Sequence, residues 1–583
     1  MAKNKRNKGP RKGEVQLKRK FNQEEVKSRA SNEETVSLHK QRFTYMETER
    51  SEVKDMWELV AKNIAPMRED MDQKDQPGER HGLEIYDGTG ISAANIATSG
   101  MFGNVLNASL PWFMVQSPIT ELNKVAEVRA WFQDVTERLL SALRLSNFYT
   151  EALPFLYDGH TIGTASMYSE YNFKKQKIVF TTIHPGQVYI AEDDDGSVDT
   201  VYRKYRPTLR NLVQKFGKEG ISPKLHNDIE SSPFKKVNIL HAIFPREEFD
   251  PRRKDNLNKP VGSVWIDLDN NYLMMESGYN SMPTIVWRYA KNSGETYGRS
   301  PATEALSDLM GLNQIGKDML GASNRATNPP VQAPEDMRGN VKLGANKINY
   351  YSSPERVIKA LDFGKYPITV DQQDRLRDLV KQHYFVDFYI SLQNAERQMT
   401  AMEVGERQAE KAVGLAPVVG RLTANTLESF IERVFDIEME QGRIPPPPPM
   451  LLEAQAASQG GVVSIQYLGP LTQIQQRRFE GRGLETTVEQ MIVVRDVFPE
   501  ALDVVDPTKL GYAIVHSKNV SQDVIRTPEE VQVLRQQRAE AAAAQAQAEQ
   551  AKLQAGAAKD MASASSMNED FAEVTKEIAS GGA

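Results

Sequence analysis

The sequence predicts a protein of the α+β class, with helical segments on both sides of a central run of strands. Apolar residues recur at three- and four-residue steps before residue 162 and again after residue 300, as in helices that bury one face. Between residues 165 and 277 apolar and polar residues alternate, and Asp- and Asn-rich turns separate the runs, as in antiparallel hairpins. Hydrophobic residues make up 40% of the 583, an ordinary globular share, so a disordered, collagen-like or membrane-embedded chain is excluded.

Two further features limit the class of protein. There is no cysteine, which excludes disulfides, cysteine-based zinc sites and thiol nucleophiles. The longest segment without charged residues, 88–120, is interrupted by polar residues and Pro111, so it indicates a buried segment of a soluble protein and not a membrane span. The basic N-terminus lacks the apolar core of a secretion signal. We therefore expect a soluble intracellular protein with no membrane partner.

Residues 1–30 form a basic arm that we expect to be disordered. Residues 1–20 hold nine Lys or Arg against Glu14, a balance of +8, so the other 563 residues carry −14 within the net charge of −6. Such an arm suits contact with a polyanion or an acidic partner, and a solvated tail that only aids solubility is an equally open alternative. Its basic residues are Lys3, Lys5, Arg6, Lys8, Arg11, Lys12, Lys18, Arg19 and Lys20.

The first half of the chain predicts four helices followed by a set of strands. Helices are expected over 33–64, 91–105, 125–145 and 147–162, the second of them lined with small residues that allow close packing. Strands are expected over 165–171, 177–183, 187–191, 197–205, 237–244, 262–269 and 272–277. The Asp193–Gly196 segment favours a hairpin turn over a cation site, because adjacent turn residues rarely converge on one ion.

After residue 300 the pattern predicts a helical hairpin with an independent tip. Ser300 and Pro301 suit the cap and first position of a helix that reaches about Arg325. A Pro/Gly/Asn-rich insert with short strands occupies 329–370, and a helix resumes from about 370 to 392.

The last third predicts more helices with one strand. Helices are expected over 403–414, 417–441 and 471–498, with Gly442 as a C-cap, Pro445–Pro449 as a polyproline spacer and a strand over 462–468. From Pro528 the chain is Ala/Gln/Glu-rich and has few large apolar residues, so it predicts a helix that needs neighbours. We expect it to fade into a disordered tail after about residue 563.

No catalytic, cofactor or metal site emerges from the motifs. The segment 311–318 nearly matches a phosphate-binding loop, but Asp318 replaces the required hydroxyl and the preceding residues look helical. The segment 88–93 resembles a dinucleotide fingerprint without the preceding strand or the later acidic residue. The eight histidines lack metal-ligand spacing. We therefore expect a protein that is not an enzyme.

Three passages together resemble the portal protein, or head-to-tail connector, of short-tailed double-stranded DNA phages. The first is Tyr86–Met101, which leads to the Pro-Trp-Phe corner at Phe113. The second is Met399–Arg407, followed by Leu415–Pro417, Arg421–Leu422 and Gly442–Pro445. The third is Leu468–Gln475, followed by a helix start at Arg526–Arg535. The resemblance covers about residues 40–540.

The resemblance implies a ring, usually of twelve copies, at one vertex of the capsid, around a channel for double-stranded DNA. It implies a wing made of residues 31–300 and 399–525, with a tunnel loop near 393–402. It also implies two stem helices (301–328 and 370–398), a clip between them (329–369) and a crown helix (526–562), followed by the tail (563–583). The implied partners are the packaging motor (terminase), major capsid and scaffolding proteins, and tail adaptors. The implied location is the virion, after assembly in the host cytoplasm.

A few basic residues are candidates for weak contacts with DNA in such a channel, with subunit salt bridges as the alternative. They are Lys317, Arg325, Lys342, Lys347 and Arg397. A different ring-forming tail adaptor or scaffold without a role in DNA passage is the alternative function, and an ATP-driven packaging enzyme is the least favoured.

Overall fold

The computed structural model describes residues 32–72, 81–250, 252–253, 255–327, 330–333, 335, 338–339, 341–342, 348–350, 358–360, 367–394, 414–457, 463–469, 510–511, 526 and 528–580. The chain divides into two compact units, residues 1–478 and 479–583. The first unit combines helices and antiparallel sheets, so the α+β expectation is confirmed.

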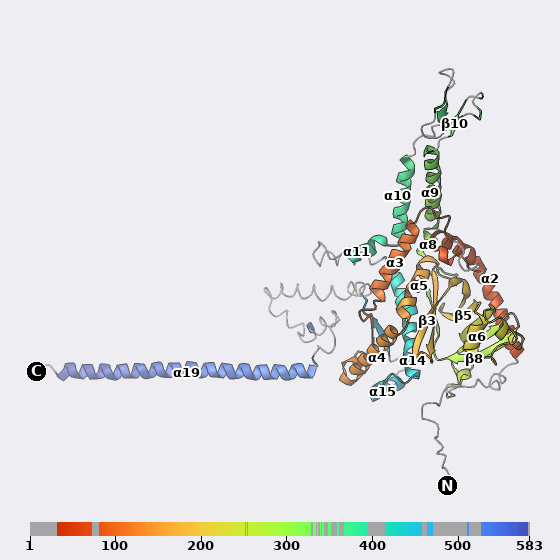
Figure 1. The fold of residues 1–583 in the computed structure, drawn as a ribbon. Helices are drawn as coiled ribbons and strands as arrows, with labels where there is room; N and C mark the ends of the chain where they lie inside the picture. Colours follow the sequence, from red (N-terminus) through yellow and green to blue (C-terminus); the bar gives the residue numbers. More distant parts are fainter. Residues whose placement is uncertain are drawn as a thin grey trace, which may run out of the picture. The chain divides into compact units, whose positions relative to one another are not determined.

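Four helices open the first unit: α2 (Asn32–Ile64), α3 (Thr89–Val105), α4 (Ala126–Leu145) and α5 (Phe148–Thr161). All four were predicted. α3 packs on α5, and α5 covers strands β2 and β3 (Figure 1). The small residues of α3 permit close contacts: a Cβ on Gly100 would lie 2.2 Å from the ring of Tyr389. The largest core cluster joins these helices to the strands below them.

Two antiparallel sheets follow. The first has the order β3-β2-β9 and consists of β2 (Thr164–Asn172), β3 (Lys177–Ile183) and β9 (Thr284–Arg288). The second has the order β4-β5-β6-β7-β8 and consists of β4 (Val188–Glu192), β5 (Val198–Tyr205), β6 (Ile239–Pro245), β7 (Val261–Asp267) and β8 (Tyr272–Tyr279). The hairpin at Asp193–Gly196 is confirmed, and Gly196 adopts the positive φ of +76° that its turn requires.

Several short elements were not predicted, among them β1 (Phe113–Gln116), β9 and α6 (Leu209–Phe216). β1 pairs with β12 (Ser464–Tyr467), which lies about 350 residues later in the chain. Elements of four to eight residues carry little periodic signal, so tertiary partners decide them.

The helical hairpin is present, but each of its two predicted helices is divided in the structure, the first of them at Ala305. α8 (Pro301–Glu304) begins at Ser300 with the predicted cap, and α9 (Leu306–Thr327) runs beside α10 (Pro367–His383), with the short β10 (Val331–Gln332) and β11 (Lys359–Ala360) beyond them (Figure 1). The single helix expected over about 370–392 is wrong. Phe385, with a φ of +53°, separates α10 from α11 (Val386–Asn394), and the turn brings Phe388 and Tyr389 into the core.

The helix expected over 417–441 is confirmed, although it contains an unpredicted π-helical turn. α13 (Ala416–Arg421) continues through the π-helical Leu422–Leu427 into α14 (Glu428–Glu440). Gly442 ends it with a φ of +67°, as its expected role as C-cap requires. α15 (Pro449–Ala457) follows the prolines. The helices expected over 403–414 and 471–498 lie outside the described residues.

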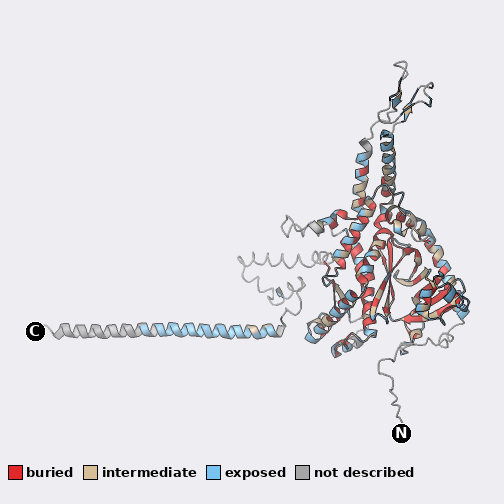
Figure 2. Cartoon of the chain, viewed as in Figure 1, coloured by how far each residue is buried: buried red, intermediate tan, exposed pale blue. Residues whose placement is uncertain are grey.

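In the second unit, helix α19 (Pro528–Ser580) is 53 residues long. The disorder expected after about residue 563 is therefore wrong as far as Ser580. No Gly or Pro occurs between residues 557 and 580 to end the helix. The described side chains of α19, the last of which is Lys559, are exposed or half-exposed (Figure 2).

Candidate functional site: the α9–α10 hairpin

The α9–α10 hairpin is the candidate site, because Lys317 and Arg325 lie on α9 and Lys342 lies in the segment of chain that connects α9 to α10. The helices meet where a Cβ on Gly311 would lie 3.6 Å from Leu376. At the base, His383 lies 3.9 Å from the carboxylates of both Glu304 and Asp308. No residue of α9 after Leu312 is fully buried. The outer half of α9 therefore faces solvent (Figure 2).

A half-buried ion pair holds α10 to the start of α3. Arg377 donates to Asp87 Oδ2 from Nε at 3.0 Å and from Nη2 at 2.9 Å, and the Asp87 side chain is only 4% exposed. The Thr89 N–H donates to the other oxygen at 2.9 Å. Burial disfavours the charged carboxylate, but the hydrogen bonds from Thr89 and Arg377 outweigh it and hold the pKa of Asp87 below its ordinary value. The carboxylate is thus ionised at neutral pH and fixes the direction of α10.

The loop before α3 supports α9 from another side. Asn313 accepts from the N–H of Tyr86 at 2.6 Å and donates to the carbonyl of Glu84 at 2.8 Å. Gly316 allows this approach, since a Cβ there would lie 3.0 Å from Tyr86. The Glu84 carboxylate pairs with Lys62 of α2 at 2.7 Å. Both helices are therefore fixed at their bases by residues 84–89.

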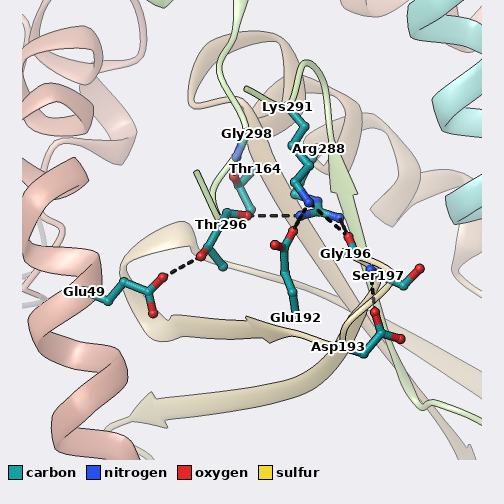
Figure 3. Close-up of polar contacts among 10 residues, drawn as sticks. All are labelled: Glu49, Thr164, Glu192, Asp193, Gly196, Ser197, Arg288, Lys291, Thr296 and Gly298. Atoms are coloured by element: carbon teal, nitrogen blue, oxygen red, sulfur yellow. Dashed lines mark hydrogen bonds and ion pairs between the residues drawn. The ribbon is translucent and has the colours of Figure 1, made fainter. Parts of the chain in front are cut away.

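The segment that leads into the hairpin is tied to both sheets (Figure 3). Arg288, at the end of β9, pairs with Glu192 of β4 and donates to the carbonyl of Gly196 at 2.8 Å. Lys291 reaches the same Glu192 carboxylate at 2.5 Å. Further along, Thr296 donates to Glu49 of α2. The segment that precedes the hairpin is therefore held by contacts of charged side chains to both sheets and to α2.

The two predicted basic residues on α9 do not form one cluster. Lys317 and Arg325 are exposed on α9, about 12 Å apart along its axis and about 80° apart around it. Lys342 is exposed, and its backbone N–H and carbonyl both bond to the Asn349 side chain at 2.8 Å. Lys347, Arg397 and the nine basic residues of the arm lie outside the described residues.

Sequence reasoning missed the groups that fix the hairpin, namely Asp87, Arg377 and Asn313. Arg377 is 290 residues from Asp87, and Asn313 is 229 from Glu84. No local sequence motif connects such distant positions. Correlated substitutions in a set of related sequences are the signal that could have revealed these contacts.

The motifs that resemble nucleotide sites have other roles. Residues 311–318 lie inside α9, so their N–H groups are engaged in the helix and cannot cradle a phosphate. Residues 88–93 form the start of α3, as expected for a turn that leads into a helix. Within the described residues, three or more His, Asp or Glu side chains nowhere gather as a metal would require. No described helix is long and apolar enough to span a membrane.

Comparison with known proteins identifies the family. Residues 37–525 match the family described as bacteriophage head to tail connecting protein. The chain is 31% identical over 487 residues to the portal protein of Salmonella phage epsilon15, covering 81% of this chain and 85% of that protein. It is 28% identical over 514 residues to the "probable portal protein" of Bordetella phage BPP-1, covering 86% and 90%. The chain therefore belongs to the bacteriophage head to tail connecting proteins, as the three sequence passages had indicated.

Proposed function

We propose that this connector protein forms the portal of a phage capsid: a ring of about twelve copies at one vertex, through which double-stranded DNA enters during packaging and leaves during ejection. The observation that carries the proposal is the projecting α9–α10 hairpin, fixed at its base to an α+β body, in a chain that the connector family matches over residues 37–525. A ring of such bodies would gather the hairpins around one axis.

The parts of the ring are assigned as follows. Residues 31–300 and 399–525 form the wing, 301–328 and 370–398 the stem, and 329–369 the clip, with the crown at 526–562. Helix α9 and the part of α10 from residue 370 onward fall within the assigned stem, whereas β10, β11 and the first three residues of α10 fall within the clip. The clip would meet the packaging motor and later the tail adaptors, and the wing would meet the capsid and scaffolding proteins. The exposed helix α19 would gain its missing partners from neighbouring copies.

The charge of the chain suits passage of DNA more than retention. Without the basic arm each copy carries −14, so twelve copies would carry about −168. A wall with this charge repels phosphate, which permits sliding in both directions. The candidates for weak, releasable contacts are Lys317, Arg325, Lys342, Lys347 and Arg397, with salt bridges between subunits as the alternative role.

We further propose that the role is structural and not enzymatic. A tail adaptor or scaffold without a DNA channel is the competing assignment, and the two differ in whether the assembly has an open hole of duplex width, about 20 Å.

Electron microscopy of the purified protein tests the proposal. The expected result is end-on views with about twelve-fold symmetry, a mass near 786 kDa for twelve copies of 65.5 kDa, and an open centre. A closed assembly without a channel would overturn the portal assignment in favour of the scaffold.

A further inference from the structure

We propose that the two outer edges of the hairpin form the contact between neighbouring copies, with Lys317 and Leu320 of α9 in one copy against Asp371 and Val370 of α10 in the next. This inference rests on the proposed ring. It assigns Lys317 to a contact between subunits and not to DNA. It also states that the α9 edge of one copy contacts the α10 edge of the next copy.

The edge of α10 that faces away from α9 is acidic. α10 contacts α9 through Leu376, and at 100° per residue Asp371, Asp374 and Asp378 lie about 160–220° around the helix from that direction. Asp374 and Asp378 have partners on their own helix, Arg377 at 3.1 Å and Lys381 at 3.0 Å. Asp371 is exposed and has no ion pair within the described residues. Val370, 44% exposed, lies beside it.

The opposite edge of the hairpin, on α9, carries the complementary groups. Measured from Gly311, which faces α10, Lys317 and Leu320 lie about 240° and 180° around the helix. Leu320 is 56% exposed. Glu84 is the nearby carboxylate, but it is held by Lys62, whose hydrogen bond is the main cause that lowers the pKa of Glu84. Lys317 is exposed and makes no ion pair within 4 Å in the described part of the chain, although its charge also acts on Glu84 from a longer distance, so its ammonium can reach an external partner.

The two sets of groups lie at the same height on the hairpin. Gly311 and Leu376 meet, and α9 and α10 run antiparallel. Lys317 is six residues above Gly311, about 9 Å, and Asp371 is five residues above Leu376, about 7.5 Å. Leu320 and Val370 lie nine and six residues above the same level, about 13.5 and 9 Å. Copies related by rotation about an axis parallel to the hairpin would therefore bring Lys317 opposite Asp371, with the two apolar side chains next to them.

A head-to-tail arrangement follows from the position of the two edges. Complementary surfaces on opposite sides of one molecule pair head to tail between successive copies, which gives a ring when the rotation between copies closes, whereas a two-fold dimer would place each edge against itself. Two acidic edges would repel each other, so the charges favour the ring.

Charge reversal tests the contact. Lys317→Glu places Glu against Asp371, and Asp371→Lys places Lys against Lys317, so each variant alone is expected to raise the concentration needed for ring formation by about tenfold or more. In an equimolar mixture, alternating copies make every contact complementary again, and rings are expected to return to wild-type concentrations. Arg210→Glu, at an exposed position of α6, is the matched reversal and is expected to assemble normally. Analytical ultracentrifugation gives the readout, and circular dichroism checks that each variant is folded.

Cross-linking provides a second test, because the chain has no cysteine of its own. Lys317→Cys/Asp371→Cys treated with a short bis-maleimide is expected to give a ladder of covalent oligomers, whereas each single cysteine gives none. If wild-type rings form but the charge variants assemble normally and the double cysteine gives no ladder, the edge contact is overturned while the ring stands. If the wild type forms no ring under any condition, the proposed function itself fails.

Discussion

We predict that the local stability of α10 depends on the half-buried ion pair between Asp87 and Arg377. Removing one partner of a buried ion pair costs about 3–5 kcal/mol, because the other charge is left without compensation. The Arg377 side chain is 37% exposed, so water screens part of this loss, and about 2 kcal/mol is expected for Arg377→Ala. At 1.36 kcal/mol per factor of ten, this corresponds to about 30-fold more frequent opening of α10.

Hydrogen exchange of the amides of α10, followed by mass spectrometry, measures this opening directly. Arg377→Ala is expected to accelerate exchange over 371–383 by about 30-fold while β5–β7 stay unchanged. Asp87→Asn should have a similar effect, since the amide keeps its shape but loses the charge. Arg375→Ala, an exposed site on the same helix, is the control. Equal exchange in Arg377→Ala and Arg375→Ala would refute the view that the pair anchors the hairpin.

Three other outcomes follow from the structure. Gly100→Val forces a side chain into the Tyr389 ring and should lower the melting temperature through a cost of about 1–3 kcal/mol, whereas Gly103→Ala, with open space around it, should change little in differential scanning fluorimetry. Arg288→Met leaves the half-buried Glu192 with Lys291 alone and should destabilise the protein by about 2 kcal/mol, and Glu192→Gln in the same background should recover part of this loss if the charge is the cause. Burial lowers the pKa of both His39 and His160 to about 4, so the unfolded chain binds more protons than the folded chain in acid. The free energy of unfolding should therefore fall as the pH drops from 6.5 towards 4, by up to about 3 kcal/mol per histidine. His39→Gln removes one of these groups and should flatten the decline of melting temperature with falling pH.

Much of the fold could be predicted from the sequence, because long elements carry their own periodic signal. The helix over 33–64 and the strand over 177–183 were located to within a residue, since each buries one face and ends at turn residues. The capped start of α8 at Ser300 and the end of α14 at Gly442 were predicted for the same reason, as both depend on chemistry local to the chain. The family itself also came from the sequence, through short passages in a fixed order.

The tertiary structure decided what depends on distant partners. The turn at Phe385 that divides α10 from α11 has no local signal: the core positions of Phe388 and Tyr389 impose it. β1 forms because β12 supplies its hydrogen bonds from the other end of the unit. The direction of the hairpin depends on Asp87 and Arg377, whose side chains meet only after folding. The tertiary structure also decided which basic residues form ion pairs within the chain. An ion pair depends on the distance between two charges in space and not on their separation in the sequence.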